Sequence, residues 1–75
     1  MYEIVVHESA DEELTAAAVF YESRETDLGQ EFLRELSQGF ERIREHPFSY
    51  SLHFDEYRRY LMGRFPYSVV YRIEG

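Results

Sequence analysis

The spacing of apolar residues predicts one strand followed by two helices in the first two thirds of the chain. Residues 2–6 form a short apolar run, which is typical of a strand. Apolar residues then recur at helical spacing, which predicts a helix over residues 9–24 and a second helix that ends near residue 45. These positions are Ala10, Leu14, Ala17, Ala18 and Tyr21 in the first helix and Phe32, Leu33, Leu36, Phe40 and Ile43 in the second.

Local signals support the helix boundaries. Ser9 and Glu12 fit a capping box, in which each side chain hydrogen-bonds the backbone of the other. Residues 27–29 read as a break between the helices, and Pro47 ends the second helix because the residue before proline disfavours helical geometry. Gly39 lies inside the second helix, where it should cost about 1 kcal/mol relative to alanine, and a close helix crossing is one explanation for it.

The last third of the chain predicts two strands. Residues 48–56 are irregular, aromatic and polar, and we expect a loop there. Strands should follow over residues 57–62 and 65–73, joined by a tight connection at residues 63–64. The chain thus predicts an α+β fold in which a two-helix hairpin packs on a small antiparallel sheet, in the order β-α-α-β-β. In the last strand we expect Tyr67, Val69, Tyr71 and Ile73 to face the helices.

Composition limits the class of protein. Seventy-five residues form one domain, and the absence of cysteine excludes disulfides and thiolate metal sites. The sequence has no metal-ligand spacing, no apolar run long enough to span a bilayer and no signal-peptide pattern. We therefore expect a soluble cytoplasmic protein without a metal or cofactor.

The net charge of −7 is unevenly distributed. Residues 1–45 hold twelve acidic residues and four arginines, a net charge of −8, whereas residues 46–75 hold three and four, a net charge of +1. All eight basic residues are arginine, which favours bidentate contacts with phosphate or carboxylate groups. The overall charge argues against general affinity for nucleic acid, so any such contact should be confined to the C-terminal third.

Four arginines and one tyrosine are the candidate contacts for a target or a phosphate. Side chains alternate along a strand, so Arg58 and Arg59 should point to opposite sides, and one of them should pair with Glu12, Glu13 or Glu35. Tyr60 is the tyrosine that we expect to point outward, where it could stack on a base. The alternative for the arginines is an ordinary solvated sheet face, and the alternative for the tyrosine is packing in the core. The candidates are Arg58, Arg59, Arg64, Arg72 and Tyr60.

The three histidines, His7, His46 and His53, have no catalytic partner implied by their spacing. A histidine near its usual pKa can act as an acid or a base at neutral pH, but only with a partner in reach. The sequence therefore identifies no catalytic residue.

The chain resembles toxins of the RelE/ParE superfamily of type II toxin–antitoxin systems, often labelled plasmid-stabilisation proteins. The resemblance covers nearly the whole chain and rests on the order of several segments rather than on one specific motif. It is carried by residues 8–14, 21–22, 28–32, 43–47, 58–62 and, most characteristically, 65–72.

The departures from that family pattern favour its ParE-like branch. The RNA-cleaving branch usually carries an arginine after the first tyrosine of the last strand here, where this chain has Ser68. Family members usually continue into a further strand, so residues 1–75 resemble a single toxin domain truncated at its C-terminus. Because the last strand then lies at a bare edge, we expect a homo-oligomer or an added partner strand there.

The resemblance implies a toxin that a cognate antitoxin neutralises. Members of the ParE-like branch are associated with DNA gyrase, whereas the alternative is a ribosome-dependent mRNA endonuclease. A degenerate homologue that binds antitoxin without being toxic is the third hypothesis. The expected antitoxin contacts are Leu61, Val69, Tyr71 and the alanines of the first helix.

Overall fold

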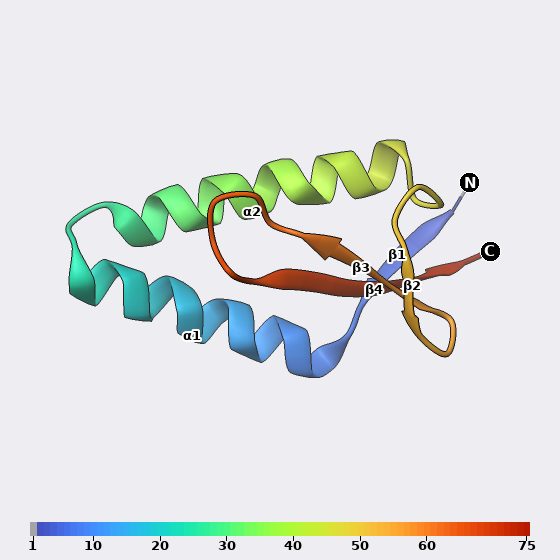
Figure 1. The fold of residues 1–75 in the computed structure, drawn as a ribbon, viewed down its shortest axis with the longest axis horizontal. Helices are drawn as coiled ribbons and strands as arrows, with labels where there is room; N and C mark the ends of the chain where they lie inside the picture. The colour runs from blue at the N-terminus through green and yellow to red at the C-terminus, as the bar shows by residue number, and fades with distance from the viewer. Residues whose placement is uncertain (1) are drawn as a thin grey trace.

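The computed structural model describes residues 2–75, with the side chains of residues 9–11 excepted, and has an α+β fold (Figure 1). In this described part, two helices follow the first strand and form a hairpin, and three more strands complete a sheet. The predicted fold class is therefore confirmed. The elements are β1 (Glu3–Val6), α1 (Glu8–Arg24), α2 (Leu28–Glu45), β2 (Leu52–Phe54), β3 (Tyr57–Leu61) and β4 (Ser68–Glu74).

The sheet has the strand order β1-β4-β3-β2, and every neighbouring pair is antiparallel. The last strand, β4, is therefore central, with Val6 of β1 opposite Tyr71 on one side and Arg58 of β3 opposite Tyr71 on the other. The expectation that β4 forms a bare edge is wrong, because β1 returns to pair with it. The predicted association through that edge loses its basis, since the edges of the sheet are β1 and β2.

A short strand was missed in the region that we expected to be a loop. β2 pairs with β3 across a turn in which Asp55 adopts a left-handed conformation, with a φ of 47°. The Phe54 and Tyr57 rings stack across this turn, with their centroids 5.0 Å apart. Such cross-strand aromatic pairs stabilise a sheet locally, which explains how three exposed residues hold a strand conformation.

The connection between β3 and β4 is longer than predicted. Residues 62–67 form a loop, so the last strand begins at Ser68 rather than at residue 65. The Met62 backbone N–H donates to the Tyr67 carbonyl oxygen at 2.9 Å, and this bond closes the loop. Phe65, at the loop's centre, is buried in the core, so the loop is held in place by packing as well.

The helices match the predicted ranges closely, and Glu22 ties them together. Asp27, the residue before α2, has a left-handed conformation with a φ of 71° and no side-chain capping bond. The Glu22 carboxylate instead accepts hydrogen bonds from the backbone N–H groups of Asp27 and Gly29, each at 3.1 Å. A carboxylate at this helix start also interacts favourably with the helix dipole. The predicted capping box at the start of α1 lies outside the described side chains.

We expect replacement of Glu22 by alanine to destabilise the protein. The substitution removes both bonds to the start of α2, a loss comparable to removal of an N-cap, about 1 kcal/mol. Urea denaturation followed by circular dichroism measures the change. Glu25→Ala, an exposed change in the following turn, is the control. Equal midpoints for the two variants would contradict the capping role.

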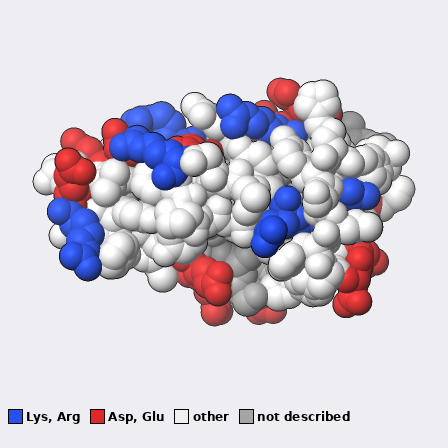
Figure 2. All heavy atoms as spheres, in the orientation of Figure 1, with Lys and Arg blue, Asp and Glu red and all other residues white. Residues whose placement is uncertain are grey.

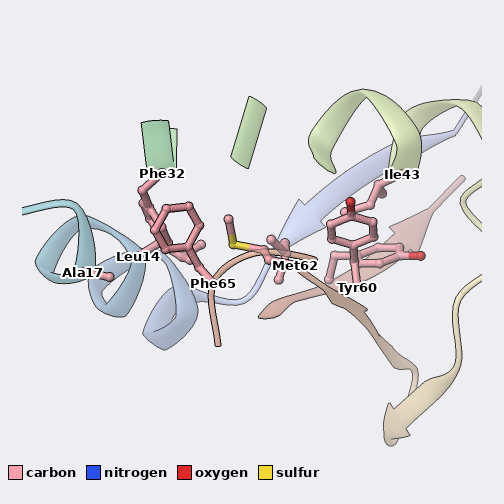
Figure 3. Close-up of a cluster of buried hydrophobic side chains, with 9 residues drawn as sticks. Leu14, Ala17, Phe32, Ile43, Tyr60, Met62 and Phe65 are labelled. Carbon is pink, nitrogen blue, oxygen red and sulfur yellow. The ribbon is translucent and has the colours of Figure 1, made fainter. Parts of the chain in front are cut away.

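The core lies between the helical hairpin and one face of the sheet. Figure 3 shows Phe32 of α2 and Phe65 of the loop turned toward Leu14 of α1, with Tyr60 beside Ile43 further along the core. Phe32 makes edge contacts with the rings of Phe65 and Tyr67 at centroid distances of 5.1 and 5.7 Å. Among the residues that the structure describes, the buried hydrophobic residues of the core are Leu14, Ala17, Phe32, Ile43, Tyr60, Met62, Phe65, Val69 and Tyr71.

Two glycines permit close packing at different places. A Cβ atom at Gly29 would lie 2.6 Å from the Ala18 carbonyl oxygen, so this glycine permits the close approach of α1 and α2. A Cβ atom at Gly39 would lie 2.7 Å from Cε2 of Tyr60, so Gly39 accommodates a ring from β3. The helix crossing considered as one explanation for Gly39 is therefore wrong, because the close approach of the two helices occurs at Gly29. Leu33, expected in the apolar stripe of α2, is exposed instead.

Candidate functional site

The strand register assigns the candidate residues to two faces of the sheet. Tyr60 lies opposite Val69, which is fully buried against the helices, so both face inward. Arg59 lies opposite Val70 and Leu61 opposite Ser68, so these four residues face outward. Neither helix covers this outer face, because the core that joins the helices to the sheet contains the inward-facing set.

Tyr60 is a core residue, and the expectation that it points outward is wrong. Its exposed fraction is 5%, and its ring meets the Tyr50 ring edge-on at 5.0 Å. The Tyr60 hydroxyl accepts a hydrogen bond of 2.9 Å from Nη1 of Arg42, and this bond raises the pKa of the Arg42 guanidinium. In this position Tyr60 has no free face on which a nucleobase could stack.

Arg58 binds the polypeptide backbone. Its Nη1 donates a hydrogen bond of 2.7 Å to the Tyr50 carbonyl oxygen and a longer one of 3.4 Å to that of Phe48. The guanidinium also lies over the Phe48 ring, 5.4 Å from its centroid. The expected ion pair with a helix carboxylate is therefore absent among the described residues. Arg58 instead fixes the segment that leads into β2.

Arg64 extends from the loop between β3 and β4 toward α2. Its Nη2 lies 3.1 Å from a carboxylate oxygen of Glu31, and its backbone N–H donates to Glu35 at 2.8 Å. Glu35, which we expected to pair with a strand arginine, thus binds the loop backbone. These contacts hold the loop against the helix and neutralise part of the charge of Arg64.

Arg72 faces outward and is surrounded by acids. It forms an ion pair with Glu74, and its Nε lies 3.9 Å from a carboxylate oxygen of Glu56. The hydrogen bond to Glu74 is the main cause that raises the pKa of the Arg72 guanidinium, and desolvation opposes it. With two carboxylates in reach, Arg72 presents little net positive charge to a ligand.

Arg59 and Leu61 remain accessible on the outer face. Arg59 is exposed, and within residues 2–75 no hydrogen bond or ion pair engages its guanidinium. Leu61, two residues further along the strand, has an exposed fraction of 63%. Figure 2 shows basic and acidic side chains in separate small groups on the visible face, without a continuous basic patch. Arg58, Arg64 and Arg72 thus bind other groups of the protein, whereas the Arg59 guanidinium does not.

The expected antitoxin contacts include both exposed and buried residues. Leu61 is on the surface, whereas Val69 and Tyr71 are fully buried. The Tyr71 hydroxyl also donates a hydrogen bond of 2.7 Å to the Pro47 carbonyl oxygen, and this bond connects β4 to the segment after α2. Neither buried residue offers surface to a partner in this fold. Of the α1 alanines, Ala16 is exposed and Ala17 is buried.

The comparison with protein families decides the wider assignment. A family model described as "ParE toxin of type II toxin-antitoxin system, parDE" matches residues 4–75. The chain belongs to the ParE toxin family. Searches of curated proteins and of solved structures each found no match. Membership of the family makes the protein a toxin-type component of a type II system, which implies an antitoxin partner.

One of the three histidines of this ParE-family protein lies among aromatic rings. His7 lies edge-on to the rings of Phe54 and Tyr57, at 5.9 and 5.1 Å, within an aromatic cluster on the outer face. The described residues hold no group of three or more metal-ligating side chains, and none of their helices is long and apolar enough to cross a membrane.

Sequence reasoning missed the exposed apolar side of α1 in this ParE-family protein. Val19 and Phe20 have exposed fractions of 67% and 46%, and Ala16 is exposed beside them. Their spacing of three and four residues is itself a second helical stripe. This outward stripe was present in the sequence, but the inward stripe of Leu14 and Ala17 was sufficient to predict the helix.

Proposed function

We propose that this protein is the toxin of a ParE-type module, that it acts by binding a protein target, and that a cognate antitoxin neutralises it. Family membership supports the toxin role. DNA gyrase is the proposed target, by similarity to the ParE-like branch. The single observation that favours a protein target is the outer sheet face, where an exposed leucine lies beside an unpaired arginine.

A mixed apolar and cationic surface suits a protein partner better than a polynucleotide. Arginine is enriched among the few residues that carry most of the binding energy of protein interfaces. Binding of an RNA backbone would need several free cations along one path, but Arg58, Arg64 and Arg72 bind groups of the protein itself. The mRNA endonuclease hypothesis therefore has no comparable observation in its favour.

Growth inhibition is the first test of the proposed function. Inducible expression in a bacterium should arrest growth, and coexpression of the adjacent gene should restore it. In vitro, the purified protein should inhibit supercoiling by gyrase. Arrest with cleaved mRNA but active gyrase would favour the endonuclease hypothesis instead. Absence of arrest at confirmed expression would favour a non-toxic homologue.

The double variant Arg59→Ala with Leu61→Ala should weaken target inhibition while leaving the fold intact. Both residues are exposed, and changes at exposed positions usually alter stability by less than about 0.5 kcal/mol. Loss of two interface contacts should raise the inhibitory concentration in the supercoiling assay by about tenfold or more. Arg34→Ala with Leu52→Ala removes the same residue types from exposed positions elsewhere and is the control. Equal inhibition by the two double variants would exclude this face as the target contact.

A further inference from the structure

Helix α1 carries apolar residues on two opposite sides. Leu14 and Ala17 point into the core, whereas Ala16, Val19 and Phe20 form an exposed ridge along the solvent side, which we call the α1 ridge. A surface helix normally has a single apolar stripe, and its other side is polar. Phe20 contacts the Tyr21 ring and the Arg24 guanidinium of its own helix, but Ala16 and Val19 beside it extend the apolar surface on the solvent side.

Two hollows flank the α1 ridge. The first, of about 390 Å³, lies between the helices where Gly29 permits their close approach, and Val19 and the exposed Leu33 line it. The second, of about 480 Å³, lies on the other side of α1 and is lined by Glu13, Ala16, Ala17, Phe20 and Tyr67. Small residues on α1 and α2 leave both hollows without a filling side chain. The ridge and its hollows can thus receive large apolar side chains on both sides.

The charge around the ridge is mainly negative, although the Arg24 guanidinium lies over the Phe20 ring, 4.8 Å from its centroid. Glu12 and Glu13 are exposed on the same side of α1 as Ala16, and the structure gives neither carboxylate a partner among the residues it describes. Figure 2 shows acidic side chains grouped near the beginning of α1, as Figure 1 places that helix. The helical two thirds of the chain, residues 1–45, have a net charge of −8. A second copy of this chain would bring the same excess of negative charge, so charge complementarity selects a basic partner.

We propose that the α1 ridge is a second protein-binding surface, separate from the outer sheet face, that docks a basic amphipathic helix of another protein. Apolar side chains of that helix, three and four residues apart, enter the two hollows on either side of Val19 and Phe20. Its lysines or arginines lie against Glu12 and Glu13. This helix-in-groove mode combines apolar anchors with a charged border that sets the orientation.

The test uses the full chain and two synthetic helical peptides. Both peptides carry the same leucine and alanine face, but one has lysines on the polar side and the other has glutamates. We expect the lysine peptide to bind at least about tenfold more tightly, with NMR shift changes concentrated on α1, Leu33 and Tyr67. Val19→Ser with Phe20→Ser should weaken binding of the lysine peptide by about tenfold, while circular dichroism shows an unchanged fold.

A charge control separates a specific site from general attraction to an acidic protein. Glu12→Gln with Glu13→Gln should reduce the preference for the lysine peptide, whereas Glu3→Gln with Glu45→Gln, which removes the same charge elsewhere, should not. Equal affinity for both peptides, equal effects of the two charge variants, or shift changes on the outer sheet face would overturn the proposal. Self-association that Val19→Ser with Phe20→Ser abolishes in sedimentation would also overturn it, because the occupant would then be a second copy. None of these measurements depends on toxicity.

Discussion

Replacement of Tyr71 by alanine should leave the chain largely unfolded. Tyr71 is fully buried in the central strand, between β1 and β3, and its hydroxyl binds the Pro47 carbonyl oxygen. Truncation of a large buried aromatic residue typically costs about 3–5 kcal/mol. Domains of this size rarely have more than about 3–5 kcal/mol of net stability. The expected result is loss of near-ultraviolet circular dichroism and of a cooperative urea transition.

Tyr71→Phe is the matched control, since it removes only the hydroxyl. It should cost about 1 kcal/mol, the usual net contribution of one hydrogen bond, and keep the cooperative transition. A cooperative transition of nearly unchanged midpoint in Tyr71→Ala would show that the centre of the core lies elsewhere.

The buried Tyr71 hydroxyl also predicts that the stability of the protein falls at alkaline pH. Burial raises the pKa of the Tyr71 hydroxyl, while nearby Arg58 acts in the opposite direction. The folded state therefore keeps this proton at pH values where the unfolded chain, with a tyrosine pKa near 10, loses it. Stability should fall as the pH rises above about 10. Tyr71→Phe should make that fall less steep without abolishing it, because burial also raises the pKa of Tyr21.

The helices and the two long strands could be predicted because their signals are local. Apolar spacing in α1 and α2, Pro47 after α2, and alternation in β4 each act within a few neighbouring residues. The position of β1 beside β4 could not be predicted in this way, since their pairing joins the two ends of the chain. β2 was missed because only three exposed residues form it and its support comes from the ring of Tyr57 across a turn.

The candidate site was harder to predict, because alternation fixes which residues share a face but not which face is inward. Tyr60 and Arg58 necessarily share one side of β3, and Arg59 and Leu61 share the other. A shift of one residue exchanges the two sets. The arginine partners are equally non-local, as Arg64 contacts Glu31 more than thirty residues away. Gly39 indicates which face of β3 is inward, since its lack of a side chain leaves room for the ring of Tyr60.

Gly39→Leu should strongly destabilise the protein, although it removes no buried side chain. A Cβ atom at this position would lie 2.7 Å from Cε2 and 3.3 Å from Cδ2 and Cζ of Tyr60. The Tyr60 ring cannot easily move away, because it is buried, meets the Tyr50 ring and binds Arg42. Leucine favours the helix over glycine by roughly 1 kcal/mol. Overpacking of a core typically costs about 1–3 kcal/mol, and with a whole leucine side chain to place we expect a net loss near 3 kcal/mol.

Two alanine variants separate the clash at Gly39 from the general effect of replacing a glycine. Gly39→Ala should destabilise the protein by about 1 kcal/mol despite its better helix propensity, because its Cβ atom meets the Tyr60 ring. At Gly63 the nearest atom to an added Cβ is a carboxylate oxygen of Glu35 at 3.7 Å, an ordinary contact. Gly63→Ala should therefore be neutral or stabilising by up to about 1 kcal/mol, since it restricts the unfolded chain. Urea denaturation of both variants measures these changes in the free energy of unfolding. A Gly39→Ala variant more stable than Gly63→Ala would show that the Tyr60 ring can move at little cost. The packing of Tyr60 against α2 would then not explain the glycine at position 39.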